Sequence, residues 1–317
     1  MNPSLLTRAF ATTAFAVSAL QAQAPATAST MPQDPASDPF LWLEDVGGDK
    51  ALQWVRAQNA TSQEVLTTHP RFEPIRTRLL SILDSTARIP YVQKHGEHYY
   101  NLWQDAQNPR GLWRRTSLEE YRKDTPKWDV VLDLDALGKA ENENWVWKSS
   151  SWLVPDRTRV LLSLSRGGAD AAVVREFDVA TKQFVADGFV LTEAKSSVAW
   201  RDRDSIYVGT DFGEGSLTSS GYPRIVKLWK RGTPLSSETT VAEGKSEDVF
   251  VYGYRDQTVG FERDFVYRGV TFYTNELFLL RDGKSLRIDK PDSANASVHQ
   301  DWLMIELRDD WQVGDTT

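Results

Sequence analysis

A hairpin-like pattern that recurs five times constrains the fold more than any other feature of the sequence. Each copy joins two short runs of aromatic and β-branched residues through a turn of polar residues or Gly, a pattern typical of β-strands. The second runs begin near Tyr99, Val160, Ile206, Val259 and Leu303. The steps between them measure 61, 46, 53 and 44 residues, with a mean of 51 residues. A four-stranded unit repeated at about this period predicts the blades of a β-propeller.

Further strand-like runs lie between the hairpins and complete the predicted units. They occupy residues 171–177, 184–185, 225–229 and 239–241. Residues 90–317 have room for about 4–5 blades, so we expect a mainly β fold with a truncated propeller. A β-sandwich has similar strands without this regular return of hairpins, and it is the alternative fold.

Charged pairs mark the turns of two of these hairpins. In the third copy, a turn at Arg201 and Asp202 is expected to join the strands. In the fourth copy, a turn at Arg255 and Asp256 is expected to lead into a strand at residues 258–261.

The first 24 residues have the layout of a secretory signal peptide. Arg8 is followed by an apolar run over residues 9–20 and by a small-x-small cleavage pattern that ends at Ala24. Residues 25–37 are rich in Pro, Ala, Ser and Thr and predict a flexible linker. No later stretch reaches the length of a membrane span. We therefore expect an exported chain, periplasmic or secreted, without a membrane span.

Residues 38–89 predict an N-terminal helical segment. Asp49 suits the N-cap of a helix that runs to about Thr67, and Pro70 ends it. A second helix is expected from apolar residues at three-to-four spacing between Phe72 and Leu83. It must end before Pro90, because the residue preceding a proline disfavours the α conformation.

Composition excludes several classes of function. The chain has no Cys, which rules out disulfides, zinc ribbons and thiol nucleophiles. Its net charge of −7 argues against a nucleic-acid partner, since phosphate binding needs a basic surface. No motif indicates a cofactor. The 12 Trp residues predict packing between blades, with a sugar-binding groove as the alternative.

His95 and His98 are the one pair of histidines close enough in sequence to suggest a metal site. They flank a tight turn, and their spacing predicts side chains on opposite faces of the hairpin. No metal ligands are therefore assigned.

The most suggestive loop is the long Gly- and Ser-rich stretch at residues 209–224, between two strands of one predicted blade. It carries Asp211, Phe212, Tyr222 and Arg224. Loops of this length commonly have a functional role, so these four residues are the candidates for a substrate-access loop. The alternative is a connector without such a role.

Several strings resemble the prolyl oligopeptidase family of serine peptidases. They are DPFLWLEDV at residues 38–46, ALQWV at residues 51–55, VGTDFG at residues 208–213, GYPR at residues 221–224 and WKRGT at residues 229–233. SRGGAD at residues 165–170 is similar to the bacterial branch. The resemblance extends over residues 38–317.

The resemblance implies a seven-bladed propeller that caps an α/β-hydrolase domain with a Ser–Asp–His triad. It also implies that the N-terminal helices pack on the hydrolase domain, which would lie beyond Thr317. Such a nucleophile occupies a G-x-S-x-G turn, and no G-x-S-x-G occurs in this sequence. No catalytic residue is therefore assigned to this chain.

The function implied by the resemblance is that of the propeller part of an exported serine endopeptidase. Its partners would be short, proline-containing peptides, admitted by size to a site outside this chain. The alternative is a non-catalytic exported propeller that binds a ligand or another protein. Nothing in the sequence specifies an oligomeric state.

Overall fold

The computed structural model describes residues 38–315. The predicted signal peptide (1–24) and linker (25–37) lie outside the described residues, and so does the end of the predicted propeller at residues 316–317. The described chain divides into two units, with the boundary between Arg78 and Leu79. This boundary falls within a helix, and the division predicted at residue 90 stays a prediction.

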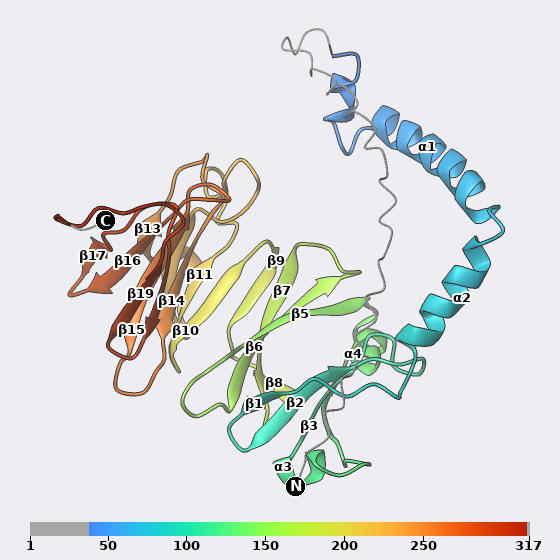
Figure 1. The fold of residues 1–317 in the computed structure, drawn as a ribbon, viewed down its shortest axis with the longest axis horizontal. Coiled ribbons are helices and arrows are strands. Elements are labelled where there is room, and N and C mark those ends of the chain that lie inside the picture. Colours follow the sequence, from blue (N-terminus) through green and yellow to red (C-terminus); the bar gives the residue numbers. More distant parts are fainter. Residues whose placement is uncertain (1–37, 316–317) are drawn as a thin grey trace, which may run out of the picture. The chain divides into compact units, whose positions relative to one another are not determined.

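The N-terminal part contains the two predicted helices. A short 3-10 turn, η2 (Leu41–Leu43), precedes α1 (Asp49–Thr67), and α2 (Phe72–Leu83) follows after Pro70 (Figure 1). The predicted bounds are confirmed, but the predicted cap is wrong. Gly48 occupies the N-cap position, and Asp49 lies in the first turn, where its charge favours the positive end of the helix dipole. Ala51 is the one buried residue of α1.

The rest of the described chain forms five antiparallel sheets. The first holds β1 (Gln93–His95), β2 (His98–Trp103), β3 (Leu112–Thr116) and β4 (Asp129–Asp133), with α3 (Leu118–Tyr121) between β3 and β4 and α4 (Leu134–Glu141) after β4. The second holds β5 (Trp145–Trp152), β6 (Arg159–Arg166), β7 (Ala172–Asp178) and β8 (Gln183–Phe184), and β9 (Val190–Ala194) pairs with β7.

The third sheet holds β10 (Ser197–Asp202), β11 (Ser205–Gly209), β12 (Ile225–Lys230) and β13 (Thr239–Glu243), with the 3-10 turn η3 (Leu235–Ser237) before β13. The fourth holds β14 (Phe250–Asp256), β15 (Arg263–Gly269), β16 (Asn275–Arg281) and β17 (Lys284–Arg287), and β18 (Asn295–His299) and β19 (Trp302–Glu306) form the last pair. Figure 1 shows the sheets following one another in chain order. Four sheets of successive strands and a further hairpin confirm the predicted propeller blades and argue against a two-sheet sandwich.

Two of the predicted turns were misplaced. In the third sheet β10 continues through Asp202, so the turn lies at residues 203–204. In the fourth, β15 begins only at Arg263, and Val259 lies in the preceding loop with 70% of its surface exposed. The Asp256 carboxylate accepts hydrogen bonds from the backbone N–H and hydroxyl of Thr258. This local turn outweighs the strand preference of Thr and Val.

The hydrophobic core consists of layers between successive sheets. Val160 and Leu162 of β6 pack towards the first sheet, whereas Leu161 packs towards the third. In the same way, Ile206 of β11 packs towards the second sheet and Tyr207 towards the fourth. Side chains alternate between the two faces of a strand, so one apolar run supplies two core layers. This explains why Val160, Leu161 and Leu162 of β6 are consecutive apolar residues.

Tryptophans occupy several of these layers. Trp113 of the first sheet contacts Trp152 of the second, with ring centroids 5.7 Å apart. Trp200 of the third sheet is fully buried, and its indole N–H donates to the carbonyl oxygen of Ser151 at 2.9 Å. These tryptophans therefore pack between blades, as the sequence predicted.

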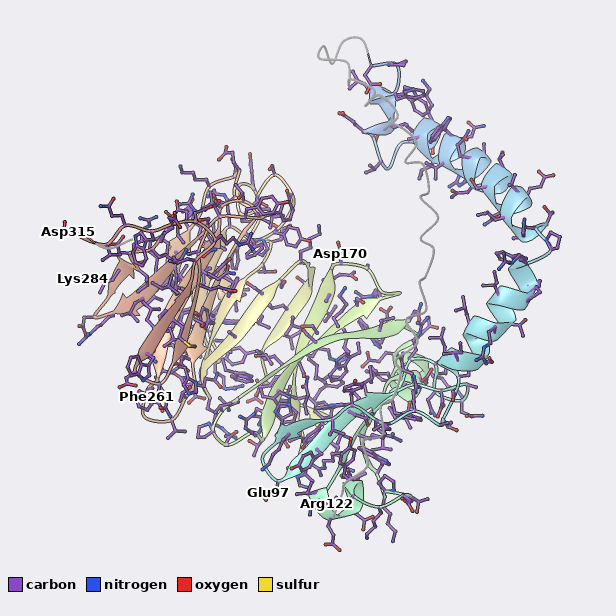
Figure 2. All side chains as sticks on the ribbon, in the orientation of Figure 1. Glu97, Arg122, Asp170, Phe261, Lys284 and Asp315 are labelled. Atoms are coloured by element: carbon purple, nitrogen blue, oxygen red, sulfur yellow. The ribbon has the colours of Figure 1, made fainter. Side chains whose placement is uncertain are left out.

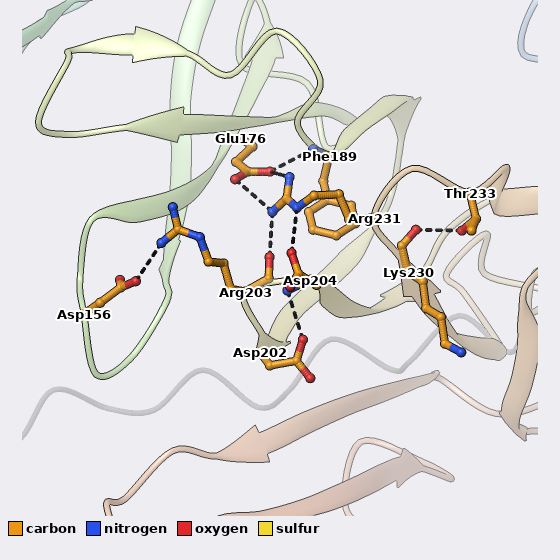
Figure 3. A network of polar contacts seen from close by, with 9 residues as sticks. All are labelled: Asp156, Glu176, Phe189, Asp202, Arg203, Asp204, Lys230, Arg231 and Thr233. Carbon is orange, nitrogen blue, oxygen red and sulfur yellow. Dashed lines mark hydrogen bonds and ion pairs between the residues drawn. The ribbon is translucent and has the colours of Figure 1, made fainter.

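A buried ion pair also joins the second and third sheets (Figure 3). The Glu176 side chain is 1% exposed and accepts from both terminal nitrogens of Arg231, at 2.8 and 3.1 Å. Its Oε2 also accepts from the backbone N–H of Phe189 at 3.0 Å. Arg231 further donates to the carbonyl oxygen of Arg203 and to Asp204. The carboxylate is thus charge-compensated and hydrogen-bonded, as a buried charge must be.

Candidate functional site

The candidate loop at residues 209–224 connects β11 to β12, at the end of the third sheet where its first strand begins. The strand register shows that three sheets share this arrangement. In each of them the first residue of the first strand pairs with the last residue of the second strand, so both lie at the same end of the sheet. The pairs are Trp145 with Arg166, Ser197 with Gly209, and Phe250 with Gly269. Figure 2 shows Asp170 at this end of the sheets, with Glu97 and Phe261 at the other. We call it the entry end, since the chain also enters β1 there.

The first half of the loop is a closed turn organised by Ser216. Its hydroxyl accepts from the backbone N–H of Phe212 at 2.9 Å and donates to the carbonyl oxygen of Gly213 at 2.6 Å. Asp211 accepts from the backbone N–H of Gly213 at 2.9 Å. Gly213 has φ of 102°, a conformation that favours glycine. Ser216 is 2% exposed, so its hydroxyl serves the turn.

Arg224 fixes the second half of the loop. Its Nε donates to the carbonyl oxygen of Gly215 at 2.6 Å, and one terminal nitrogen donates to the carbonyl oxygen of Gly244 at 2.9 Å. The same nitrogen lies 2.5 Å from the Glu243 carboxylate. Charge-assisted hydrogen bonds of this kind are stronger than neutral ones. Arg224 therefore ties the loop to the end of β13.

The four candidate residues point to different surroundings. Phe212 packs against the core layer between the second and third sheets, and the Lys227 ammonium lies 4.8 Å from its ring centroid. Asp211 and Arg224 shape the loop, as described above. Tyr222 is 38% exposed and faces a pocket. The structure thus directs one of the four towards a cavity, and the role of all four in substrate access stays a prediction.

The pocket beside Tyr222 has a volume of about 290 Å³ and is built from three sheets. Its lining residues are Asp170, Lys195, Ser196, Ser197, Tyr222, Pro223, Phe250, Val251 and Tyr252. Sequence reasoning missed all of these except Tyr222. They are scattered over more than eighty positions and share no spacing. The hairpin repeat was the one signal in the sequence that could have shown that their strand ends lie at the same end of neighbouring sheets.

The two histidines beside the first turn are placed differently from the prediction. His95 and His98 are cross-strand partners, so they lie on the same face of the hairpin, and both rings contact Tyr100. The predicted opposite faces are wrong, because residues i and i+3 of a two-residue hairpin stand directly opposite each other. His95 stacks on Trp152 at 4.1 Å, and its Nδ1 accepts from Arg157 at 2.9 Å. The lone pair of this nitrogen therefore already accepts a hydrogen bond from the Arg157 guanidinium.

The environment of His95 predicts a pH-dependent stability. Burial, and then the positive charge of Arg157, lower the pKa of His95 from 6.5 to about 4. As pH falls from about 6.5 to about 4, the unfolded chain binds a proton that the folded chain refuses, so stability is lost in this window. The His95 ring is only partly buried, so we expect a loss of about 2 kcal/mol.

The measurement is urea unfolding of the wild-type chain and of His95→Phe at about pH 7 and about pH 4. The wild-type chain should lose about 2 kcal/mol more than the variant, which keeps the aromatic stack without the titrating group. Carboxylates contribute equally to both chains and cancel in the difference. Equal losses in the two chains would contradict the prediction.

Within residues 38–315, His, Asp and Glu side chains form no group of three or more that could hold a metal ion. No helix in this range is both long and apolar enough to span a membrane.

Comparison with known proteins gives consistent results over most of the chain. The family described as "Prolyl oligopeptidase, N-terminal beta-propeller domain" matches residues 21–288. The uncharacterized peptidase y4nA of Sinorhizobium fredii is 41% identical over 252 residues, which cover 78% of this chain and 35% of the relative. A prolyl endopeptidase of Elizabethkingia miricola is 27% identical over 212 residues, covering 66% of this chain and 28% of the relative.

Among solved structures, a post-proline cleaving enzyme from Rickettsia typhi is similar, with a TM-score of 0.79 and 27% identity. The similarity covers 86% of this chain and 42% of that enzyme. The chain thus spans between about a quarter and two fifths of the length of these three proteins.

Proposed function

Because this chain belongs to the prolyl oligopeptidase family, whose propeller domain matches residues 21–288, we propose that it forms the propeller part of a serine endopeptidase acting on short, proline-containing peptides. The match of that domain to a chain of successive blade sheets is the observation that carries the proposal. Acyl transfer would be performed by a Ser nucleophile, a His base and an orienting Asp of a hydrolase domain.

The proposed task of the propeller is to admit substrates by size. The entry end supports this proposal, because it gathers the long β11–β12 loop and the pocket beside Tyr222. The loop is held by Ser216 and Arg224, so it offers a fixed surface to a passing peptide. A fixed surface discriminates between ligands at a lower cost in entropy than a mobile one.

We also propose that the protein is exported. The support is the arrangement of Arg8, the apolar run at residues 9–20 and the cleavage pattern ending at Ala24. Expression of the whole chain in a Gram-negative host, followed by N-terminal sequencing, tests this proposal. We expect a periplasmic product that begins at Pro25, and a cytoplasmic product that keeps Met1 would refute export.

The peptidase proposal is tested by supplying a catalytic segment. The chain is co-expressed with the part of the Sinorhizobium relative that follows its matched region, and the complex is purified. The substrates are a fluorogenic peptide with Pro before the leaving group and a folded protein that displays the same sequence on a loop. We expect the complex to cleave the peptide and to spare the folded protein.

The catalytic segment alone is the control, and it should show weaker discrimination between the two substrates. A fluorophosphonate probe, which labels reactive serines, counts the active sites in each preparation. A stable complex that takes up no probe and leaves the peptide intact would argue against the peptidase role. That result would favour the alternative, a non-catalytic binding propeller.

A further inference from the structure

The pocket beside Tyr222 combines apolar walls with a lysine in its lining. Tyr222, Phe250 and Tyr252 supply aromatic surface, and Pro223 and Val251 add aliphatic surface. A volume of about 290 Å³ lies at the lower limit of the usual range for ligand pockets. The space therefore suits one ring-bearing residue and excludes a long peptide.

Lys195 has hydrogen-bonding capacity to spare. Its ammonium lies 4.4 Å from the ring centroid of Tyr222 and donates to the carbonyl oxygen of Ser220 at 3.5 Å. An ammonium carries three N–H donors, and among the described residues this single long hydrogen bond uses one of them. The remaining donors are available to an acceptor that enters the pocket.

Asp170 is the nearest anion to Lys195, and it is weakly held. The closest nitrogen–oxygen distance is 3.9 Å, which is too long for a hydrogen bond. The Asp170 side chain is 72% exposed, and ion pairs at such exposure contribute little. An incoming carboxylate can therefore replace Asp170 as the partner of Lys195 at small cost.

We propose that this pocket binds the C-terminal residue of a short peptide. The ring of that residue would lie against Tyr222, Phe250 and Tyr252, and its carboxylate would accept hydrogen bonds from Lys195. A C-terminal residue carries a ring and a carboxylate within one residue, whereas an Asp or Glu carboxylate belongs to a different residue from the ring, and the pocket has room for one residue. The inference rests on the proposed function for its ligand class, and it deepens that function by adding a subsite at the entry end.

The first experiment needs no variant. N-acetyl-Ala-Phe with a free carboxylate and the same peptide as its C-terminal amide are titrated into the full chain by calorimetry. A hydrogen bond to a charged acceptor is stronger than one to a neutral acceptor, so we expect the amide to bind about tenfold more weakly or worse. The preference should shrink as salt is raised, because added ions screen a partly exposed charge pair.

Three variants then assign the preference to Lys195. Lys195→Met should abolish the preference for the free acid, whereas Asp170→Asn should strengthen acid binding by up to about fivefold, since it removes the competing anion. Lys227→Met is the matched control. Lys227 also lies over an aromatic ring, that of Phe212, but it does not line the pocket, so this variant should keep the wild-type preference. Circular dichroism verifies that each variant is folded.

Equal affinity for acid and amide, or no binding of either by the folded chain, would overturn the inference. An acid preference that survives in Lys195→Met would overturn it as well. Peptide hydrolysis by the two-part complex reports separately on the proposed function. If the acid preference is absent and hydrolysis occurs, the proposed subsite is refuted and the proposed peptidase role is not. If hydrolysis is absent and the acid preference is present, the peptidase role is refuted and the subsite is not.

Discussion

Replacement of Glu176 by Leu is expected to lower the free energy of unfolding by about 3 kcal/mol or more. The substitution leaves Arg231, whose side chain is 24% exposed, without its buried partner. It also leaves the backbone N–H of Phe189 without its acceptor. The loss is large because a charge that has been taken out of water must be compensated within the protein.

Urea unfolding of the Glu176→Leu chain measures this loss. Glu193→Leu is the matched control, because Glu193 pairs with Arg166 at 2.9 Å with both side chains more than a third exposed. That pair should contribute less than about 1 kcal/mol. Glu176→Leu combined with Arg231→Leu should recover much of the loss, because no unpaired charge remains in the interior and Asp204, which also loses Arg231, is 78% exposed. Similar losses for Glu176→Leu and Glu193→Leu would contradict the interpretation.

Replacement of Trp200 by Ala is expected to lower the free energy of unfolding by about 3–5 kcal/mol. The side chain is fully buried between the second and third sheets, and its ring lies 5.8 Å from that of Phe189. Truncation removes apolar surface, opens a cavity and leaves the carbonyl oxygen of Ser151 without its indole donor. Each of these changes destabilises the same layer of the core.

Trp302→Ala provides the comparison for Trp200→Ala. Trp302 lies on β19 with 69% of its surface exposed, so its removal should change stability by less than about 0.5 kcal/mol. The loss of stability in Trp200→Phe should fall between those of the two Ala variants, because Phe keeps much of the packing and loses the hydrogen bond. The urea midpoints of the three variants are converted to free energies of unfolding with one common m-value, and these free energies are compared. A Trp200→Ala chain as stable as Trp302→Ala would show that this layer does not hold the sheets together.

The repeat in the sequence was sufficient to predict the sheets because their strands are built from local patterns. Each of β6 and β11 contains three consecutive apolar residues, at 160–162 and 206–208, and turn residues precede both strands. The prediction was wrong at residues 258–261, where the Asp256 carboxylate closes a turn that strand propensity alone does not reveal. Local hydrogen bonds of this kind compete directly with strand pairing.

The candidate site was predictable only in part. Loop length drew attention to residues 209–224, but it gave no information on which side chains turn inward. Phe212 packs against the core while Tyr222 faces the pocket, a difference that depends on the turn around Ser216. Lys195 and Phe250 meet Tyr222 only through the stacking of three sheets. Such contacts depend on tertiary geometry, which no spacing in the sequence encodes.

The division of β6 between two core layers has a consequence for how this protein unfolds. Val160 and Leu161 are adjacent in the chain, yet each stabilises a different neighbouring sheet. A sheet that loses its order therefore uncovers apolar surface on both sides at once. Stability of this kind is shared between nearest neighbours, as in a one-dimensional array. Local unfolding of one sheet should destabilise the sheets on both sides of it. The interior blades are therefore expected to unfold together as one cooperative unit.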